Sequence, residues 1–108
     1  MTDELSEDTL VALARSSRVR VGAAAGAALR DDSGRNYAGA TVALPHLDLS
    51  ALQVAVVLAV AAGAHGVEAA VVVGEDDLDL SVLRDLGGNG VPVHLMDARG
   101  HWLRSVST

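Results

Sequence analysis

The longest apolar stretch of the chain, Leu49–Ala64, constrains its fold more than any other feature. Ser50 and Gln53 are its only polar residues, and it is too short to span a bilayer comfortably. We therefore expect a buried helix of a globular domain, with Asp48 or Ser50 as its N-cap and Gly63 at its end. Because such a helix has almost no polar face, it has to be covered on nearly all sides.

The segments on either side of this helix alternate between helical and extended patterns. The β-branched run Val67–Val73 is typical of a strand that is buried on both faces, and the turn residues Asp31–Gly34 predict a hairpin. Further helices are expected at Asp3–Ser16 and Leu78–Leu86, and further strands at Val19–Leu29, Asn36–Leu44, Val91–Met96 and His101–Val106. The order αββαβαββ predicts an α/β fold, a single domain over residues 1–108 in which helices cover a five-stranded mixed sheet.

The charge and the composition exclude several classes of function. All eight basic residues are arginine, and the formal net charge is −6. With so little basic surface, and with Tyr37 and Trp102 as the only aromatic residues, we expect no nucleic-acid partner. The chain has no cysteine, which excludes disulfides, thiolate zinc sites and cysteine nucleophiles. The acidic segment Met1–Leu5 lacks the positive flank of a signal peptide, so we expect a cytoplasmic protein without a membrane partner.

Three consecutive segments resemble the cytidine deaminase family. Ala25–Leu29 reads Ala-Gly-Ala-Ala-Leu, Gly34–Gly39 reads Gly-Arg-Asn-Tyr-Ala-Gly, and the apolar helix follows them. The family's hairpin has a similar small-residue strand, then glycine-arginine, a tyrosine and a glycine at the same spacing. The resemblance implies a three-layer α/β/α fold, a zinc cofactor, and dimers or tetramers with active sites near subunit boundaries.

The positions that carry the family's chemistry differ in this chain. Ser50 and Leu52 stand where the resemblance implies a zinc-binding cysteine and a proton-shuttling glutamate. Asp76 and Asp79 stand where it implies the other two zinc-binding cysteines. Serine is a poor zinc ligand beside a thiolate, and leucine cannot transfer a proton. The aspartates are also explained as residues that favour a helix N-terminus, so we expect no bound zinc and no catalytic residues.

The positions implied to bind a nucleoside are changed as well. Thr41 and Ala43 replace the asparagine and the glutamate that hold the ribose, and Ala23 lies near the position of a ring-stacking phenylalanine. His46 is the histidine closest to this region in the sequence. We treat these four residues as the lining of a residual pocket.

The leading hypothesis is a pseudoenzyme: a deaminase-like protein that has lost zinc-dependent deamination and acts as an oligomeric scaffold, partner or regulatory subunit. We expect a homodimer or homotetramer whose subunits meet through the helix Leu49–Ala62, because a chain of this size cannot easily cover such a helix alone. The alternatives are a divergent nucleoside deaminase with unconventional metal ligands, such as Asp76, Asp79 and His46, and a metal-free nucleoside binder. The composition, rich in alanine and with arginine as its only basic residue, suggests a bacterial source.

Overall fold

The computed structural model describes residues 2–75 and 78–108, with side chains from Glu7 onward. Five strands form one sheet in the order β2-β1-β5-β6-β7, and β3 and β4 form a separate two-stranded hairpin. Within the main sheet β5 and β6 are parallel, and the other neighbours are antiparallel. The described elements are α1 (Thr2–Val21), β1 (Gly26–Asp31), β2 (Asn36–Ala40), β3 (Val42–Leu44), β4 (Leu47–Leu49), α2 (Ala51–Ala61), β5 (Val67–Val73), α3 (Ser81–Gly87), β6 (Pro92–Met96) and β7 (Trp102–Ser107).

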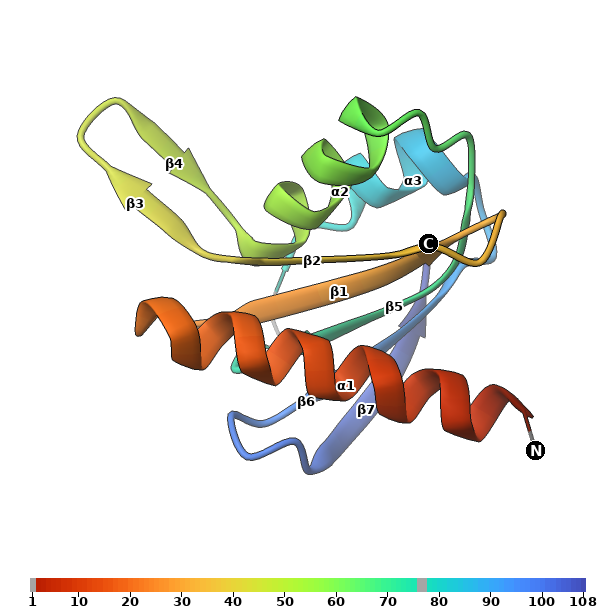
Figure 1. The fold of residues 1–108 in the computed structure, drawn as a ribbon, viewed down its shortest axis with the longest axis horizontal. Helices are drawn as coiled ribbons and strands as arrows, with labels where there is room; N and C mark the ends of the chain where they lie inside the picture. The colour runs from red at the N-terminus through yellow and green to blue at the C-terminus, as the bar shows by residue number, and fades with distance from the viewer. Residues whose placement is uncertain (1, 76–77) are drawn as a thin grey trace.

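The sheet lies between two helical layers, as predicted from the sequence (Figure 1). Helix α1 covers one face, where Leu10 and Ala14 pack on alternate residues of β1 and β5. Helices α2 and α3 cover the other face and enclose the larger apolar cluster, which includes Leu52, Val56 and Leu83. Strands β1 and β5 are buried on both faces over most of their length because they lie between these layers, which explains the apolar runs Gly26–Leu29 and Ala69–Val73.

The first helix is longer than predicted, and the strand expected over Val19–Leu29 is wrong before Gly26, where β1 begins. Helix α1 continues through Val19 to Val21, both of which are exposed. It ends where the N–H of Gly22, at a φ of 65°, donates to Val19 O and the N–H of Ala23 donates to Arg18 O. This pair of bonds is a Schellman motif, which needs a residue in the left-handed conformation. The alternation of valine and arginine is therefore the last turn of a helix.

The strand predicted over Asn36–Leu44 is divided in two. Strand β2 ends at Ala40, and β3 pairs with β4 in a hairpin that projects from the sheet (Figure 1). Pro45 and His46 form the turn between them, so Pro45 ends a strand as expected but also starts a reversal of the chain. Helix α3 begins at Ser81, later than the predicted Leu78.

The β1–β2 turn is organised by the carboxylate of Asp31, which is 2% exposed. Its Oδ1 accepts hydrogen bonds from Ser33 N at 2.9 Å, Ser33 Oγ at 2.7 Å and Arg35 N at 2.9 Å, and its Oδ2 accepts one from the Tyr37 hydroxyl at 3.2 Å. Burial alone would raise the pKa of Asp31, but these hydrogen bonds to the charged form lower it below the ordinary value of 3.8.

We expect Asp31→Asn to be less stable than the wild type at neutral pH. Because the pKa of Asp31 is lowered on folding, its carboxylate stabilises the fold above the ordinary aspartate pKa of 3.8. That contribution is lost as the pH falls through the lower, folded-state pKa. Urea denaturation across this pH range should therefore show the two proteins converging in acid. The exposed neighbour Asp32, changed to Asn, is the matched control, and a similar loss there would contradict the role of Asp31.

Candidate functional site

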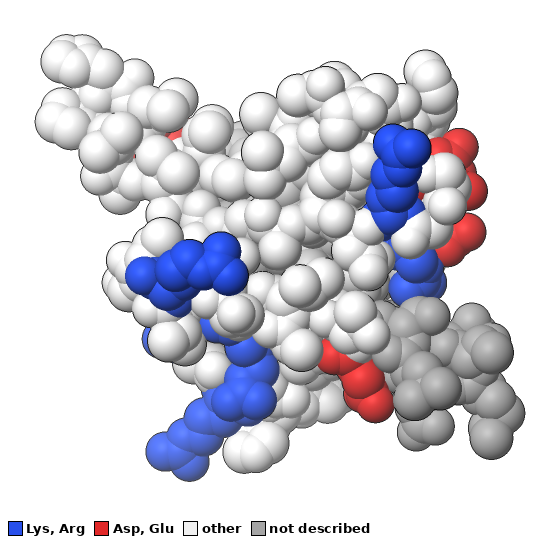
Figure 2. Space-filling view, in the orientation of Figure 1, with Lys and Arg blue, Asp and Glu red and all other residues white. Residues whose placement is uncertain are grey.

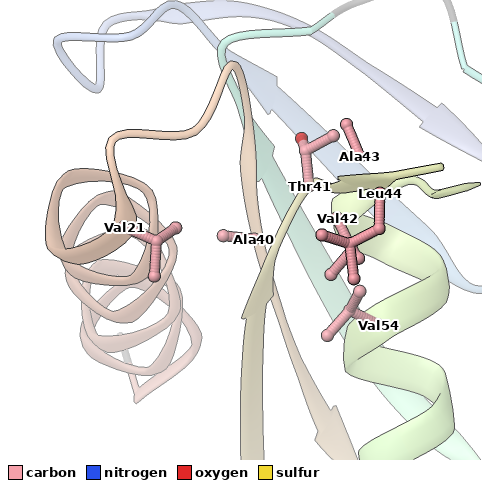
Figure 3. Close-up of a pocket in the computed structure, with 7 residues that line it drawn as sticks. All are labelled: Val21, Ala40, Thr41, Val42, Ala43, Leu44 and Val54. Carbon is pink, nitrogen blue, oxygen red and sulfur yellow. The ribbon is translucent and has the colours of Figure 1, made fainter. Parts of the chain in front are cut away.

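A groove lies where helix α1 ends, strand β2 ends and the β3–β4 hairpin begins (Figure 3). Its volume is about 410 Å³, and seven residues line it: Val21, Ala40, Thr41, Val42, Ala43, Leu44 and Val54. Figure 3 shows Val21 of α1 on one side and Val42, Leu44 and Val54 on the other, with Ala40 between them. The groove is therefore almost wholly apolar.

The structure brings two of the four predicted pocket residues, Thr41 and Ala43, to this groove. The Thr41 hydroxyl accepts a hydrogen bond from Ala25 N at 3.2 Å and donates one to Ala25 O at 3.3 Å. The only polar side chain in the lining is thus already bound to the backbone. Ala43 contributes no polar group, so the lining offers little to recognise a sugar hydroxyl or a base edge.

Ala23 and His46 do not line the groove. Ala23 follows helix α1 and is half-buried, with its N–H bonded to Arg18 O at 3.0 Å. His46 is exposed in the turn of the β3–β4 hairpin, which Figure 1 shows extending away from the sheet. Sequence reasoning missed the apolar lining residues Val21 and Val54, because they come from helices on opposite faces of the sheet, and only the fold brings both to the same groove.

Ser50 is the N-cap of helix α2, one of the two caps that the sequence allowed. Its Oγ accepts a hydrogen bond from Gln53 N at 3.1 Å, and Gln53 Oε1 accepts one from Ser50 N at 2.8 Å. This reciprocal arrangement is a capping box, and it satisfies two backbone donors that a helix start leaves unpaired. The Ser50 hydroxyl therefore has a structural partner.

Leu52 lies in the apolar core between helix α2 and the sheet. Its side chain is 1% exposed and packs in the cluster that contains Leu29, Val72 and Leu95. Almost no solvent reaches this position, and the apolar side chains around it offer a charge no hydrogen bond. The site at which the resemblance implies an acid–base group is therefore part of the core.

Asp79 precedes helix α3 and forms a turn with Ser81. Its Oδ1 accepts hydrogen bonds from Ser81 Oγ at 2.6 Å and Ser81 N at 2.9 Å, and these bonds lower its pKa below 3.8. Asp76 lies outside the described residues. Among the residues that the structure describes, no three histidine, aspartate or glutamate side chains are grouped closely enough to hold a metal ion.

These residues do not fit the zinc that the family resemblance implies. Ser50 is a neutral hydroxyl within a capping box, and Leu52 is an apolar core residue. Zinc sites need thiolate, imidazole or carboxylate ligands, with a further group to move protons in a hydrolase. Ser50 and Leu52 therefore supply neither a zinc ligand nor a group that transfers protons.

A polar cluster that the sequence analysis missed lies on the face of the sheet that helix α1 covers. His94 of β6 is 8% exposed, and its Nδ1 is 2.6 Å from Ser105 Oγ on β7. Its Nε2 is 2.7 Å from Glu7 Oε2 on helix α1. The available signal was a histidine within the otherwise apolar strand Val91–Met96, but its partners are distant in the sequence and only the fold brings them together.

Within the described residues, no helix is both long enough and apolar enough to cross a membrane. The three-layer arrangement, with a five-stranded mixed sheet of order β2-β1-β5-β6-β7, defines an α/β protein of the deaminase type. The family model described as cytidine deaminase-like matches residues 4–100. The chain therefore belongs to the cytidine deaminase-like family.

Solved structures support the same fold. The crystal structure of cytidine deaminase from Burkholderia pseudomallei is similar with a TM-score of 0.79 and 25% sequence identity, over 93% of this chain and 91% of that chain. Cytidine deaminase from Mycobacterium leprae is similar in fold, with a TM-score of 0.70 and 21% identity over 82% of this chain and 86% of that chain. Among curated protein sequences, none matches this chain.

Proposed function

We propose that this protein has lost zinc-dependent deamination and acts as an oligomeric scaffold, partner or regulatory subunit. The proposal rests on the residues at the start of helix α2, which hold the fold together where the resemblance implies catalytic groups. The Ser50 hydroxyl closes a capping box, and the Leu52 side chain fills the core. Deamination needs a metal-activated water and a proton relay at the ring carbon under attack, and neither residue supplies such a group.

The outer surface of helix α2 supports an oligomeric role. Val57, Leu58 and Val60 are between 45% and 54% exposed, and the helix carries no charged residue. Leu44 and Leu47 of the adjacent hairpin are also exposed. Figure 2 shows a largely uncharged surface over the hairpin and α2, and the arginines on this face lie at separate places outside it. Contiguous apolar surface of this kind marks an interaction site, and a second copy of the chain would cover it.

We expect Val60→Glu to shift the protein from dimer or tetramer to monomer at micromolar concentration. A buried, unpaired carboxylate at the subunit interface costs a few kcal/mol, which raises the dissociation constant by about 100-fold or more. Light scattering coupled to gel filtration measures the change. Val19→Glu is the matched control, since Val19 is an exposed valine on helix α1, and it should leave the mass unchanged. A wild-type protein that is monomeric under these conditions would refute the oligomeric proposal.

The loss of deamination is tested by the metal content and the activity of the purified, untagged protein. We expect zinc well below one per chain by plasma mass spectrometry and no ammonia release from cytidine. Near-stoichiometric zinc with turnover that is lost in Asp76→Ala, Asp79→Ala or His46→Ala would instead establish a divergent deaminase. Thermal stabilisation by a nucleoside panel, without metal or turnover, would establish a nucleoside binder and count against a scaffold role alone.

A further inference from the structure

Ser105, His94 and Glu7 form a continuous chain of polar contacts across three elements of the fold. The Ser105 Oγ to His94 Nδ1 distance is 2.6 Å, and the His94 Nε2 to Glu7 Oε2 distance is 2.7 Å. A hydroxyl within hydrogen-bond reach of an imidazole, which is oriented in turn by a carboxylate, is the recurring geometry of an activated nucleophile. The order of these residues in the sequence gives no hint of it.

The sheet register explains why the serine and the histidine meet. His94 and Ser105 are direct cross-strand partners in the antiparallel pair β6–β7. The N–H of Thr108 donates to Val91 O, which makes those two a hydrogen-bonded pair. Alternation along the ladder then makes His94 and Ser105 a non-hydrogen-bonded pair, the type whose side chains lie closer together. The contact is therefore fixed by the backbone.

The side chains of Ser105 and His94 differ in burial, and this difference indicates a different role for each. Ser105 is exposed on the edge strand β7, so a substrate can reach its Oγ. His94 is 8% exposed, and its Nε2 is sealed from solvent. The carboxylate of Glu7 lies beside Nε2, off the line of an ideal hydrogen bond, and its charge favours the tautomer with the proton on Nε2. Nδ1 is then the free acceptor for the Ser105 hydroxyl proton.

We propose that Ser105, His94 and Glu7 form an acyl-transfer site for small carboxylic esters, separate from the groove beside the hairpin. Ser105 is the nucleophile, His94 is the general base, and Glu7 is a positioning residue that acts through His94. Trp102 supplies an exposed apolar surface for the substrate, since its ring centroid is 5.3 Å from that of His94. The site lies on the face of the sheet that helix α1 covers, so it does not depend on the function proposed above.

The reaction conserves atoms and charge without a cofactor. Ser105 Oγ forms a bond to the acyl carbon, its proton moves to His94 Nδ1, and the ester C–O bond breaks as the proton passes to the leaving alkoxide. A water molecule then attacks the acyl carbon and gives one proton to His94 Nδ1. The acyl–Oγ bond breaks, that proton passes from His94 to Ser105 Oγ, and the carboxylic acid leaves. The same ladder alternation directs the Ser105 N–H toward the open edge of the sheet, where it can donate to the oxyanion that develops beside Oγ.

The test uses p-nitrophenyl acetate with the full-length protein. We expect nitrophenolate release that falls by about 100-fold or more in Ser105→Ala and in His94→Gln, the range that a positioned base contributes. Ser107→Ala is the matched control, because Ser107 is an exposed serine on the same strand whose hydroxyl contacts Thr108 O and not a histidine. It should retain the wild-type rate.

Peptide mapping after a short reaction provides a readout that needs no variant. Acetyl groups should accumulate on Ser105 in preference to Ser107 within the same molecules. Glu7→Gln should slow the reaction, and Glu7→Asp should restore part of the rate, which a purely structural contact on α1 would not predict. Release no faster than in buffer, or release that survives Ser105→Ala or His94→Gln, would overturn the proposal.

Discussion

Replacing Leu52 with glutamate, the residue that the family resemblance implies at this position, lowers the free energy of unfolding by about 3 kcal/mol or more. Leu52 is 1% exposed and surrounded by apolar side chains, so the new carboxylate has no hydrogen-bond donor and no water. The variant gains no deaminase activity, because the position belongs to the core. Urea denaturation at neutral pH measures the loss.

Leu52→Gln isolates the cost of the charge, since it has nearly the same shape as glutamate and cannot ionise. Burial raises the pKa of the introduced glutamate in the folded state, so the variant becomes less stable relative to Leu52→Gln as the pH rises above about 4. In acid, where the carboxyl is neutral in both states, the two variants should converge. Leu52→Met should cost less than about 1.5 kcal/mol. A Leu52→Glu protein as stable as Leu52→Met at neutral pH would place the side chain outside the core.

The second large effect is expected at Gly26, where helix α1 crosses the sheet at close range. A Cβ added at Gly26 would overlap the carbonyl oxygen of Ala14, and it would lie 3.0 Å from the Cβ of Arg18. Both obstacles belong to the rigid part of a helix, so the helix itself has to move. We expect Gly26→Ala to lower the free energy of unfolding by about 2 to 3 kcal/mol, measured by urea or thermal denaturation.

Gly66→Ala is the control for this effect. A Cβ at Gly66 would meet only the side chain of Asp32, at 3.3 Å, and an exposed side chain can move aside. We expect a change within about 0.5 kcal/mol. Equal losses at Gly26 and Gly66 would contradict the close approach of helix α1 to β1 as the cause, because Gly→Ala without a steric clash lowers the entropy of the unfolded chain and does not destabilise the fold.

The elements with strong internal patterns were predicted correctly. The apolar helix from Ser50 to Gly63 and the β-branched strand Val67–Val73 appear at the expected positions. Both patterns report the burial of the segment itself, which is a local property of the sequence. The two shorter strands at the C-terminus were also found, within one residue at each end.

The errors lie where two local patterns compete. The valines and arginines of residues 18–21 alternate as in a strand, but they continue helix α1. The helix ends at Gly22, where the backbone hydrogen bonds of the Schellman motif close it. The apolar segment before Pro45 reads as one strand, yet it leaves the sheet after Ala40 to form the hairpin with β4. Neither outcome depends on propensity alone, because tertiary packing decides between conformations of similar local energy.

The sequence by itself determined the order of the helices and of the strands of the main sheet, though not the β3–β4 hairpin. It also determined the family and the absence of the thiolate ligands and the glutamate that the resemblance implies. Those are properties of single residues and of their spacing. Only the tertiary structure decided that Thr41 and Ala43 face an apolar groove while His46 lies apart from it, and that His94 meets Ser105 and Glu7. Such contacts join residues far apart in the chain, and they follow from sheet register and helix placement, which no local pattern encodes.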